Sequence, residues 1–146
     1  MGKAIVIDID GVILDSAFLF DEIFKLGLKG DAMWDYFHEH CNSPRVTFMK
    51  NIISLVKNIS PEVSVMLSTS RNDICRRETE ERLQEENFLY NYLYMRRNGD
   101  YRPSSDIKRE HLKDISKNFE IIAFIDDDLS NCQMAKDEGI LALRRV

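Results

Sequence analysis

Two aspartates near the start of the chain have the spacing of a pair that could transfer a phosphoryl group. The apolar residues 3–7 predict a buried strand, and Asp8 and Asp10 follow it directly. Side chains alternate along a strand, so both carboxylates can project to the same side, and Gly11 permits a sharp turn after them. One carboxylate could then attack phosphorus while the other handles the proton and Mg²⁺ screens the charge. An acidic turn that caps the next helix is the alternative, and the surrounding residues decide between the two.

The rest of the chain alternates short apolar runs with amphipathic segments. Strands are predicted at residues 3–8, 63–68, 93–95, 121–125 and 141–143. Helices are predicted at residues 17–24, 32–40, 48–59, 73–88, 107–117 and 130–138. Continuous apolar strands separated by helices are typical of a parallel sheet that is covered on both faces. We therefore predict one α/β domain over residues 1–146, a three-layer Rossmann-like fold with a sheet of about five strands.

Polar residues gather at the predicted carboxyl ends of four of these strands, where α/β proteins of this kind bind ligands. These residues are Asp8 and Asp10, then Thr69, Ser70 and Arg71, then Arg96, Arg97, Arg102 and Lys108, and finally Asp126, Asp127 and Asp128. Each is a weak signal alone, because a hydroxyl can cap a helix and a lysine on a helix is usually exposed. Together they supply acids for a metal and a proton, and hydroxyl and cationic groups for phosphate oxygens. The combination predicts a phosphate site.

Composition and charge argue against a membrane protein, a disulfide-bonded protein and a protein with a general affinity for nucleic acid. The longest apolar runs have about five residues, whereas a membrane helix needs roughly 18, so we expect no contact with a membrane. Three cysteines without a CxxC pair and no basic-then-apolar leader favour a cytoplasmic protein without disulfides. The net charge of −5 gives no general attraction to nucleic acid. Residues 91–113 nevertheless carry six Lys/Arg against three Asp/Glu, and residues 126–138 carry five acids against one lysine.

The order of these residues resembles a known enzyme superfamily. DxDGV at residues 8–12, a hydroxyl residue after the second strand, a later lysine and an Asp-Asp pair resemble the four motifs of haloacid dehalogenase (HAD) phosphotransferases. Residues 70–71, 75–80, 94–102 and 106–110 resemble more closely the phosphatase domain of phage-type polynucleotide kinase/phosphatase, and residues 34–37 with Cys41 are similar to its stand-alone relatives. The resemblance covers nearly the whole chain. It implies a HAD-like fold with a small helical cap insertion at about residues 15–45.

The resemblance also implies a role for each candidate residue. Asp8 is the nucleophile that forms an aspartyl-phosphate, and Asp10 protonates the leaving oxygen and later takes a proton from water. Mg²⁺ is held by Asp8, the backbone carbonyl of Asp10, and Asp127 together with Asp126, all of them oxygen ligands. Thr69 donates to a phosphate oxygen, and Lys108 offsets the negative charge. The substrate-binding residues are Ser70, Arg71, Arg96, Arg97 and Arg102.

Some positions depart from the pattern of the family. Val12 replaces the more usual Thr, Ser70 stands where relatives often have Gly, and Asp128 stands where relatives often have Arg. The last change weakens the expected contact with an anionic substrate. No GxxxxGK[ST] loop occurs, so we expect no ATP-dependent phosphorylation.

Three functions are compatible with these residues, and none requires a protein partner. Only about fifty residues separate Asp10 from the second strand, so the site is expected to be open, with Arg71, Arg96, Arg97 and Arg102 at its rim. Such a site suits the 3′-phosphorylated end of DNA or RNA. The acidic net charge and Asp128 favour instead a nucleotide monophosphate or another small phosphate ester. A non-catalytic phospho-acceptor module, similar to a response-regulator receiver domain, is less consistent with the order of the motifs.

The histidines and aromatic residues support no further site. His38 and His40 are interpreted as surface residues and His111 as a helix-face residue, because they lack metal-ligand spacing such as HExxH. Trp34 and Tyr36 are interpreted as packing residues, and a base-stacking role stays open.

Overall fold

The chain forms a five-stranded parallel sheet in the order β5-β4-β1-β6-β7. The computed structural model describes residues 1–146. The strands are β1 (Gly2–Ile7), β4 (Val63–Asn72), β5 (Tyr92–Arg96), β6 (Phe119–Asp126) and β7 (Ala142–Arg144). Every pair of neighbours is parallel. The predicted α/β fold with about five parallel strands is therefore confirmed.

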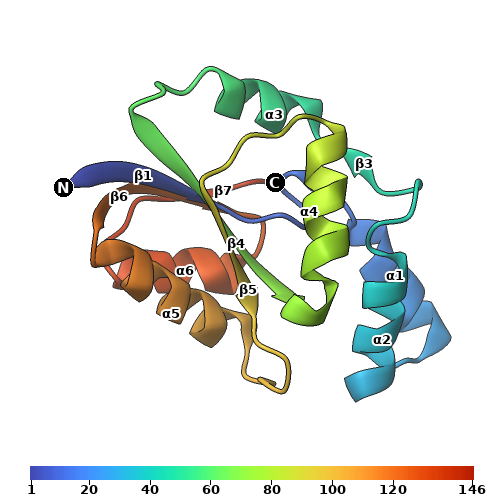
Figure 1. The fold of residues 1–146 in the computed structure, drawn as a ribbon. Coiled ribbons are helices and arrows are strands. Elements are labelled where there is room, and N and C mark those ends of the chain that lie inside the picture. The colour runs from blue at the N-terminus through green and yellow to red at the C-terminus, as the bar shows by residue number, and fades with distance from the viewer.

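Helices cover both faces of this sheet (Figure 1). Those on one face are α3 (Lys50–Lys57) and α4 (Arg76–Glu85), and those on the other are α5 (Ser104–Ser116) and α6 (Leu129–Asp137). Successive side chains of the central strand β1 point to opposite faces. Ile5 and Ile7 accordingly pack in a core of 23 buried residues with α3 and α4, while Ala4 and Val6 pack in one of eight with α5 and α6. A segment buried on both faces must be apolar, which is why the buried part of β1, Ala4 to Ile7, is a continuous apolar run.

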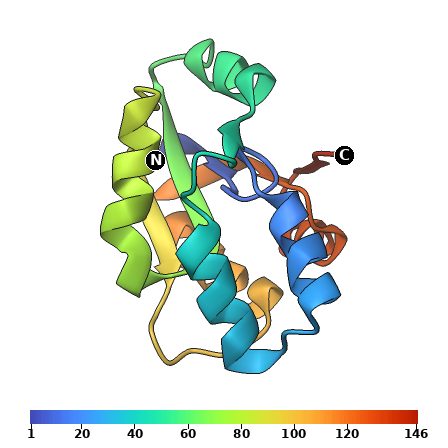
Figure 2. The same cartoon turned by 90° about the vertical axis from the view of Figure 1, so that its right-hand side faces the viewer.

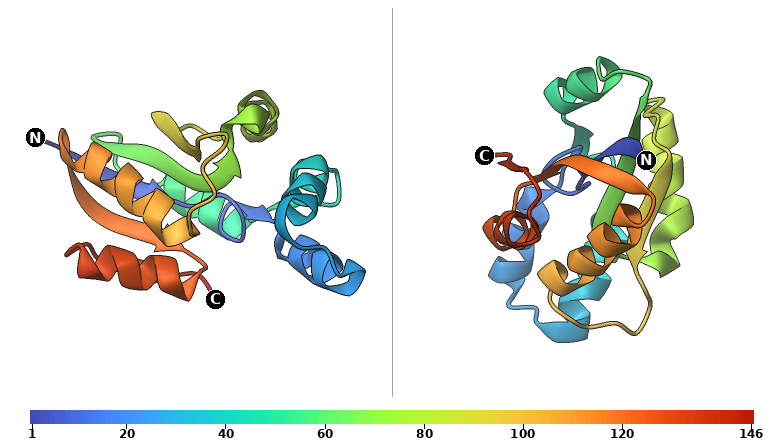
Figure 3. Two further views of the ribbon diagram at one scale, coloured as in Figure 1. Left: turned by 90° about the horizontal axis from the view of Figure 1, so that it is seen from below. Right: turned by 90° about the vertical axis from the view of Figure 1, so that its left-hand side faces the viewer.

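A pair of helices leaves the sheet after β1 and lies at the end opposite the N-terminus (Figure 3). The helices are α1 (Ala17–Leu26) and α2 (Gly30–His40). Two antiparallel strands of two residues, β2 (Leu14–Asp15) and β3 (Thr47–Phe48), close the base of this insertion. The rings of Phe20 and Phe37 stack 5.2 Å apart between the two helices.

Several boundaries differ from the sequence prediction. β4 continues to Asn72, four residues beyond the predicted end, because Asn72 pairs with Arg96 of β5 after a shift in register. The predicted helix 48–59 begins at Lys50, since Phe48 belongs to β3. The predicted helix 73–88 is divided into a 3-10 turn, η1 (Asp73–Cys75), and α4. No helix combines the length and the apolar character that crossing a bilayer requires.

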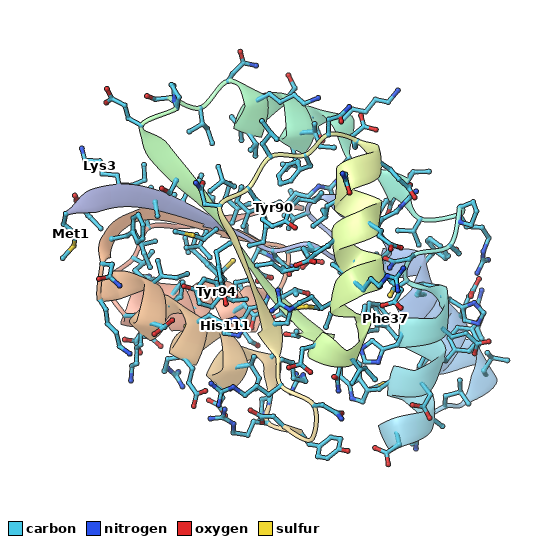
Figure 4. All side chains as sticks on the ribbon, viewed as in Figure 1. Met1, Lys3, Phe37, Tyr90, Tyr94 and His111 are labelled. Atoms are coloured by element: carbon cyan, nitrogen blue, oxygen red, sulfur yellow. The ribbon has the colours of Figure 1, made fainter.

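Two histidines lie deeper than the sequence interpretation placed them. His111 on α5 is buried, and its Nε2 lies 3.2 Å from the carbonyl oxygen of Met95, so this nitrogen carries the hydrogen. Its Nδ1 then accepts from Ser68 Oγ at 2.8 Å, and the ring packs beside Tyr94 (Figure 4). Burial lowers the pKa of His111 to about 4, so it joins α5 to the sheet as a neutral ring. His38 is half-buried, and its Nε2 accepts from the Asn72 N–H at 3.3 Å.

Candidate active site

Six of the candidate residues line one hollow. The carboxyl ends of the strands, where these residues lie, are at the side of the sheet that carries α1 and α2 (Figure 2). The hollow has a volume of about 510 Å³ and is lined by Asp8, Asp10, Ser70, Arg71, Lys108 and Asp127, among others. Parallel strands bring these residues together because their carboxyl ends lie at one edge, so side chains up to 119 positions apart become neighbours.

Protein groups hold the Asp8 carboxylate through its Oδ1, and no protein donor contacts its Oδ2. Its Oδ1 accepts from the Ile9 N–H at 2.8 Å and lies 2.8 Å from Lys108 Nζ. Oδ2 receives no hydrogen bond from the protein, although Asp8 lines the hollow. Burial raises the pKa of Asp8 well above its usual range against the opposing charge of Lys108, and the charges of Asp126 and Asp10 add to the rise. The carboxylate is fixed in place and one of its oxygens is available to react.

Lys108 is a buried ammonium between two carboxylates. Its Nζ lies 2.8 Å from Asp8 Oδ1 and 2.6 Å from Asp126 Oδ2. Burial alone would lower the pKa of Lys108, but these two carboxylates outweigh it and raise that pKa. Asp126 also accepts from the Asp128 N–H at 2.9 Å and from Asn131 Nδ2 at 3.2 and 3.3 Å. Both oxygens of Asp126 are therefore occupied by protein donors.

The residues around Asp8 have the chemistry of a site for a hard cation. Asp8, Asp126 and Asp127 can each place a carboxylate oxygen within 4.8 Å of the others. Three carboxylates against the single ammonium of Lys108 leave an excess of two negative charges, which a divalent cation with oxygen ligands would balance. Gly11 leaves the space for Asp127, because a Cβ at position 11 would overlap its Oδ2. The donor set and the space both fit Mg²⁺.

We expect Gly11→Ala to weaken Mg²⁺ binding in addition to straining the backbone. Gly11 has a φ of +82°, and Gly99 has a φ of +86° but nothing within 4 Å of an added Cβ. Both alanine variants should lose about 1 kcal/mol of stability in urea denaturation, because a positive φ is strained for alanine. Only Gly11→Ala should reduce the rise of Tm with added Mg²⁺, since it displaces Asp127. An equal Mg²⁺ response in both variants would show that Asp127 does not contribute to the metal site.

Arg71 lines the hollow as a fully buried side chain and does not lie at its rim. The expectation that the Arg71 charge lies at the rim of the site is therefore wrong. The Arg71 guanidinium forms a fork with Asp10, with Nε at 2.9 Å from Oδ2 and Nη2 at 2.8 Å from Oδ1. Nη1 donates to Asn42 Oδ1 at 2.7 Å, and Ser16 Oγ donates to Asp10 Oδ1 at 2.8 Å. Burial raises the pKa of Asp10, but the Arg71 guanidinium outweighs it and holds that pKa below the usual value. The charge that was expected at the rim is used to position Asp10.

The two hydroxyl residues after Ser68 occupy different places. Thr69 is buried, and its Oγ1 accepts from the Arg71 N–H at 3.1 Å, which leaves its own hydrogen to donate elsewhere. Ser70 lines the hollow and lies 2.5 Å from Ser104 Oγ. Ser104 in turn accepts from Asn131 Nδ2 at 3.2 Å. The sequence assigns no role to Asn131, four residues after Asp127, and the prediction did not include Ser104, although the Pro-Ser-Ser start of α5 marks a helix terminus that faces the site.

The three remaining arginines lie outside the catalytic hollow. Arg96 is buried and donates to the carbonyl oxygens of Ser70, Asp100 and Arg102, so it fixes the connection between β5 and α5. Arg102 forms ion pairs with Asp100 and Glu110. Arg97 is exposed and forms no ion pair. Arg144, which the sequence analysis did not single out, does line the hollow and donates from Nε to the Asp127 carbonyl at 3.1 Å.

The fold and the match to a phosphatase family model define the class of protein, a phosphoric monoester hydrolase of the HAD type. The sequence model described as "Polynucleotide kinase PNKP phosphatase domain" matches residues 29–144, most of the chain. The chain therefore belongs to the family of PNKP phosphatase domains, as its resemblance indicated. The matched region begins after β1, so Asp8 and Asp10 lie outside it.

Solved structures show the same fold at low sequence identity. A chain of the Pnkp1/Rnl/Hen1 RNA repair complex is similar over 99% of this chain, with a TM-score of 0.79 and 20% identity. A haloacid dehalogenase-like hydrolase from Streptococcus pneumoniae matches 98% of this chain and 84% of its own, with a TM-score of 0.71 and 15% identity. A HAD family enzyme from Bacteroides thetaiotaomicron, solved as a magnesium complex, matches 99% of this chain and 93% of its own, with a TM-score of 0.62 and 16% identity.

The chain spans 42% of the length of the similar chain in the RNA repair complex. Comparison with curated protein sequences gives no match.

Proposed function

We propose that this protein is a Mg²⁺-dependent phosphatase that forms an aspartyl-phosphate on Asp8 and removes the 3′-phosphate from a nucleic-acid end. One observation carries the proposal. Asp8 is fixed through Oδ1 by Lys108, while Oδ2 has no donor and the carboxyl of Asp10 lies in the same hollow. A nucleophile and an acid–base group are thus available to a single phosphate.

In the first half-reaction, Asp8 Oδ2 forms a bond to phosphorus as the bond to the ester oxygen breaks. Asp10 gives its proton to that leaving oxygen. An entering phosphate adds negative charge beside Asp10 and so favours the protonated form that this step needs. Lys108 and the hydroxyls of Thr69 and Ser70 are the groups proposed to balance the charge on the phosphate oxygens.

In the second half-reaction, a water molecule attacks the phosphorus of the aspartyl-phosphate. Asp10 takes the proton of this water, and the bond between phosphorus and Asp8 Oδ2 breaks to release inorganic phosphate. The Arg71 fork lowers the pKa of Asp10 and prevents its rotation, and a fixed carboxylate suits the base role. Arg71 is therefore proposed to act on the substrate through Asp10.

The proposed metal ligands are Asp8, Asp127 and the backbone carbonyl of Asp10, with Asp126 beside them. Because Asp126 already accepts from Lys108, Asn131 and the backbone, we assign Asp127 as the closer ligand and Asp126 as the residue that orients Lys108. Mg²⁺ bound there would offset the repulsion between Asp8 and an incoming phosphate.

The family and the RNA repair complex make a phosphorylated RNA or DNA end the first substrate to test. Arg144 at the hollow and exposed Arg97 are the proposed contacts for the chain that leads to this end. Two observations favour the alternative of nucleotide monophosphates and other small esters. The charge of Arg102 is balanced by Asp100 and Glu110, and Asp128 is exposed at the hollow. Both weaken attraction to a polyanion.

Phosphate release from a panel of esters tests the proposal. We expect Mg²⁺-dependent release that EDTA stops, with a 3′-phosphorylated oligonucleotide preferred over 3′- and 5′-mononucleotides and over the 5′-phosphorylated oligonucleotide. The kcat/KM for the oligonucleotide should fall steeply with salt, because several phosphates contact the protein, and that for a mononucleotide should fall much less. Preference for a mononucleotide would leave the chemistry in place and reject the nucleic-acid end. Release that EDTA does not affect would reject the metal.

A further inference from the structure

A second hollow adjoins the catalytic one and has no part in the chemistry proposed above. It has a volume of about 270 Å³ and lies between α2 and residues 96–102, which connect β5 to α5. Ser70 and Trp34 line both hollows, so the two hollows are neighbours that meet at these residues. A molecule whose phosphate reaches Asp8 can therefore extend past Ser70 and Trp34 into this space.

Flat groups form the walls of the second hollow. The rings of Trp34 and His38 lie 6.1 Å apart at 25° to one another, and the Arg96 Cζ lies 5.6 Å from the indole centroid. Arg96 is held in its plane by three backbone carbonyl oxygens. Trp34 packs against the main core with one part of its surface, and the other part lines both hollows. Trp34, His38 and Arg96 thus present planar groups beside the hollow, as a stacking site requires.

The charges around this hollow exclude a second phosphate. Three carboxylates line it, from Asp31, Asp35 and Asp100, against the guanidinium groups of Arg96 and Arg102. Arg102 is already neutralised by Asp100 and Glu110. A dianion placed here would meet a net negative surface, whereas a neutral ring would not.

Polar groups at the edge of the hollow can hydrogen-bond to such a ring. Asn72 Nδ2 donates to Asn98 Oδ1 at 3.1 Å, and both amides line the space. The Asn98 side chain is exposed, and the amide oxygen of Asn72 accepts from the Ile74 N–H at 3.0 Å in an exposed hydrogen bond. A planar, neutral group with donors and acceptors along its edge is a nucleobase.

We propose that this second hollow binds the nucleobase of the nucleotide whose phosphate is cleaved, with Trp34 as the stacking surface. This inference rests on the proposed function, because it assumes that the phosphate of the substrate lies at Asp8. The ribose would then cross between the hollows beside Ser70. The base would be held in both an oligonucleotide end and a mononucleotide, which share this chemistry.

Kinetics with and without the base test this proposal. KM is measured for a nucleoside 3′-phosphate, for a 3′-phosphorylated dinucleotide, and for an abasic deoxyribose 3-phosphate that lacks the base. We expect Trp34→Leu to raise KM by about 5- to 100-fold for the two substrates with a base, with little change for the abasic ester. Trp34→Phe should restore most of the loss, and Tyr92→Leu, an exposed aromatic residue of β5 that lines neither hollow, should have no effect. An equal rise for all three esters would overturn the proposal, since Trp34 would then only support the catalytic hollow.

Fluorescence separates a failure of the base site from a failure of the proposed function. Trp34 is the only tryptophan of the chain, so a stacked base should quench nearly all the indole emission. We expect the Asp8→Asn variant, which should bind without turnover, to be quenched by a nucleoside 3′-phosphate and not by the abasic ester. Quenching without hydrolysis by the wild type would retain the base site and reject the phosphatase. Hydrolysis without quenching would retain the phosphatase and reject the base site.

Discussion

Replacement of Asp8 by Asn is expected to lower kcat by about 10⁴-fold or more, as the loss of a nucleophile does in enzymes that form a covalent intermediate. Asparagine keeps the shape of the side chain and can still accept from the Ile9 N–H and Lys108 through its amide oxygen. What it lacks is the anionic Oδ2 that would attack phosphorus. Single-turnover release of phosphate from a 3′-phosphorylated oligonucleotide measures the effect.

The same substitution should not harm the fold. Burial raises the pKa of Asp8, and the negative charges of Asp126 and Asp10 add to the rise. Removing the charge of Asp8 should leave Tm in EDTA unchanged or higher. It should also reduce the gain in Tm from Mg²⁺, because one ligand has lost its charge. Asp15→Asn, at an exposed aspartate of β2, is the matched control and should change neither property. Full activity in Asp8→Asn would mean that another group attacks phosphorus.

Trapping the intermediate gives an independent check on the role of Asp8. Acid quenching of the wild type during turnover of a labelled substrate should leave phosphate on the protein, since an acyl phosphate survives brief exposure to acid. The label should be absent from Asp8→Asn. Label on any other residue would contradict the assignment of Asp8.

The location of the site could be predicted because it depends on features that are local in the sequence. Continuous apolar runs such as residues 4–7 identify strands that are buried on both faces, and parallel strands all end at one edge. A polar residue directly after such a run must lie at that edge. This reasoning placed Asp8, Ser70 and Asp127 in one hollow without knowledge of any contact between them.

The pairing of individual side chains could not be predicted, because it depends on contacts between distant segments. Arg71 and Asp10 are 61 positions apart, and only the fold shows that the guanidinium lies beneath the carboxylate. The hydrogen bond of Arg71 to Asn42 depends in addition on how the helical insertion packs on the sheet. The hairpin of β2 and β3 has two residues in each strand, too few to show an alternating pattern.

Replacement of Lys108 by Met should cost both stability and activity. Lys108 is 1% exposed and its ammonium lies between Asp8 and Asp126, so its removal leaves two buried carboxylates without a counter-charge. Breaking a buried ion pair in this way costs about 3–5 kcal/mol, which urea denaturation in EDTA should detect. Loss of a cation that balances the transition-state charge should lower kcat by about 10²- to 10³-fold. Lys113→Met, at an exposed position of the same helix α5, should be close to neutral in both measurements.

The cause of the stability loss in Lys108→Met can be identified from how this loss depends on pH and on Asp126. Lys108 opposes the rise in the pKa of Asp8, so without Lys108 the folded-state pKa of this carboxyl should be raised further. Stability is then present below the unfolded pKa of Asp8 near 4 and is lost as the pH rises through the folded value. The deficit of Lys108→Met relative to the wild type should therefore shrink between pH 7 and pH 5. The double variant Lys108→Met, Asp126→Asn should recover stability, because one of the two unpaired charges is gone, but it should not recover activity, because Asp8 and the phosphate still lack the ammonium. A deficit that is the same at both pH values and in the double variant would mean that Lys108 contributes through the packing of its aliphatic chain and not through its charge.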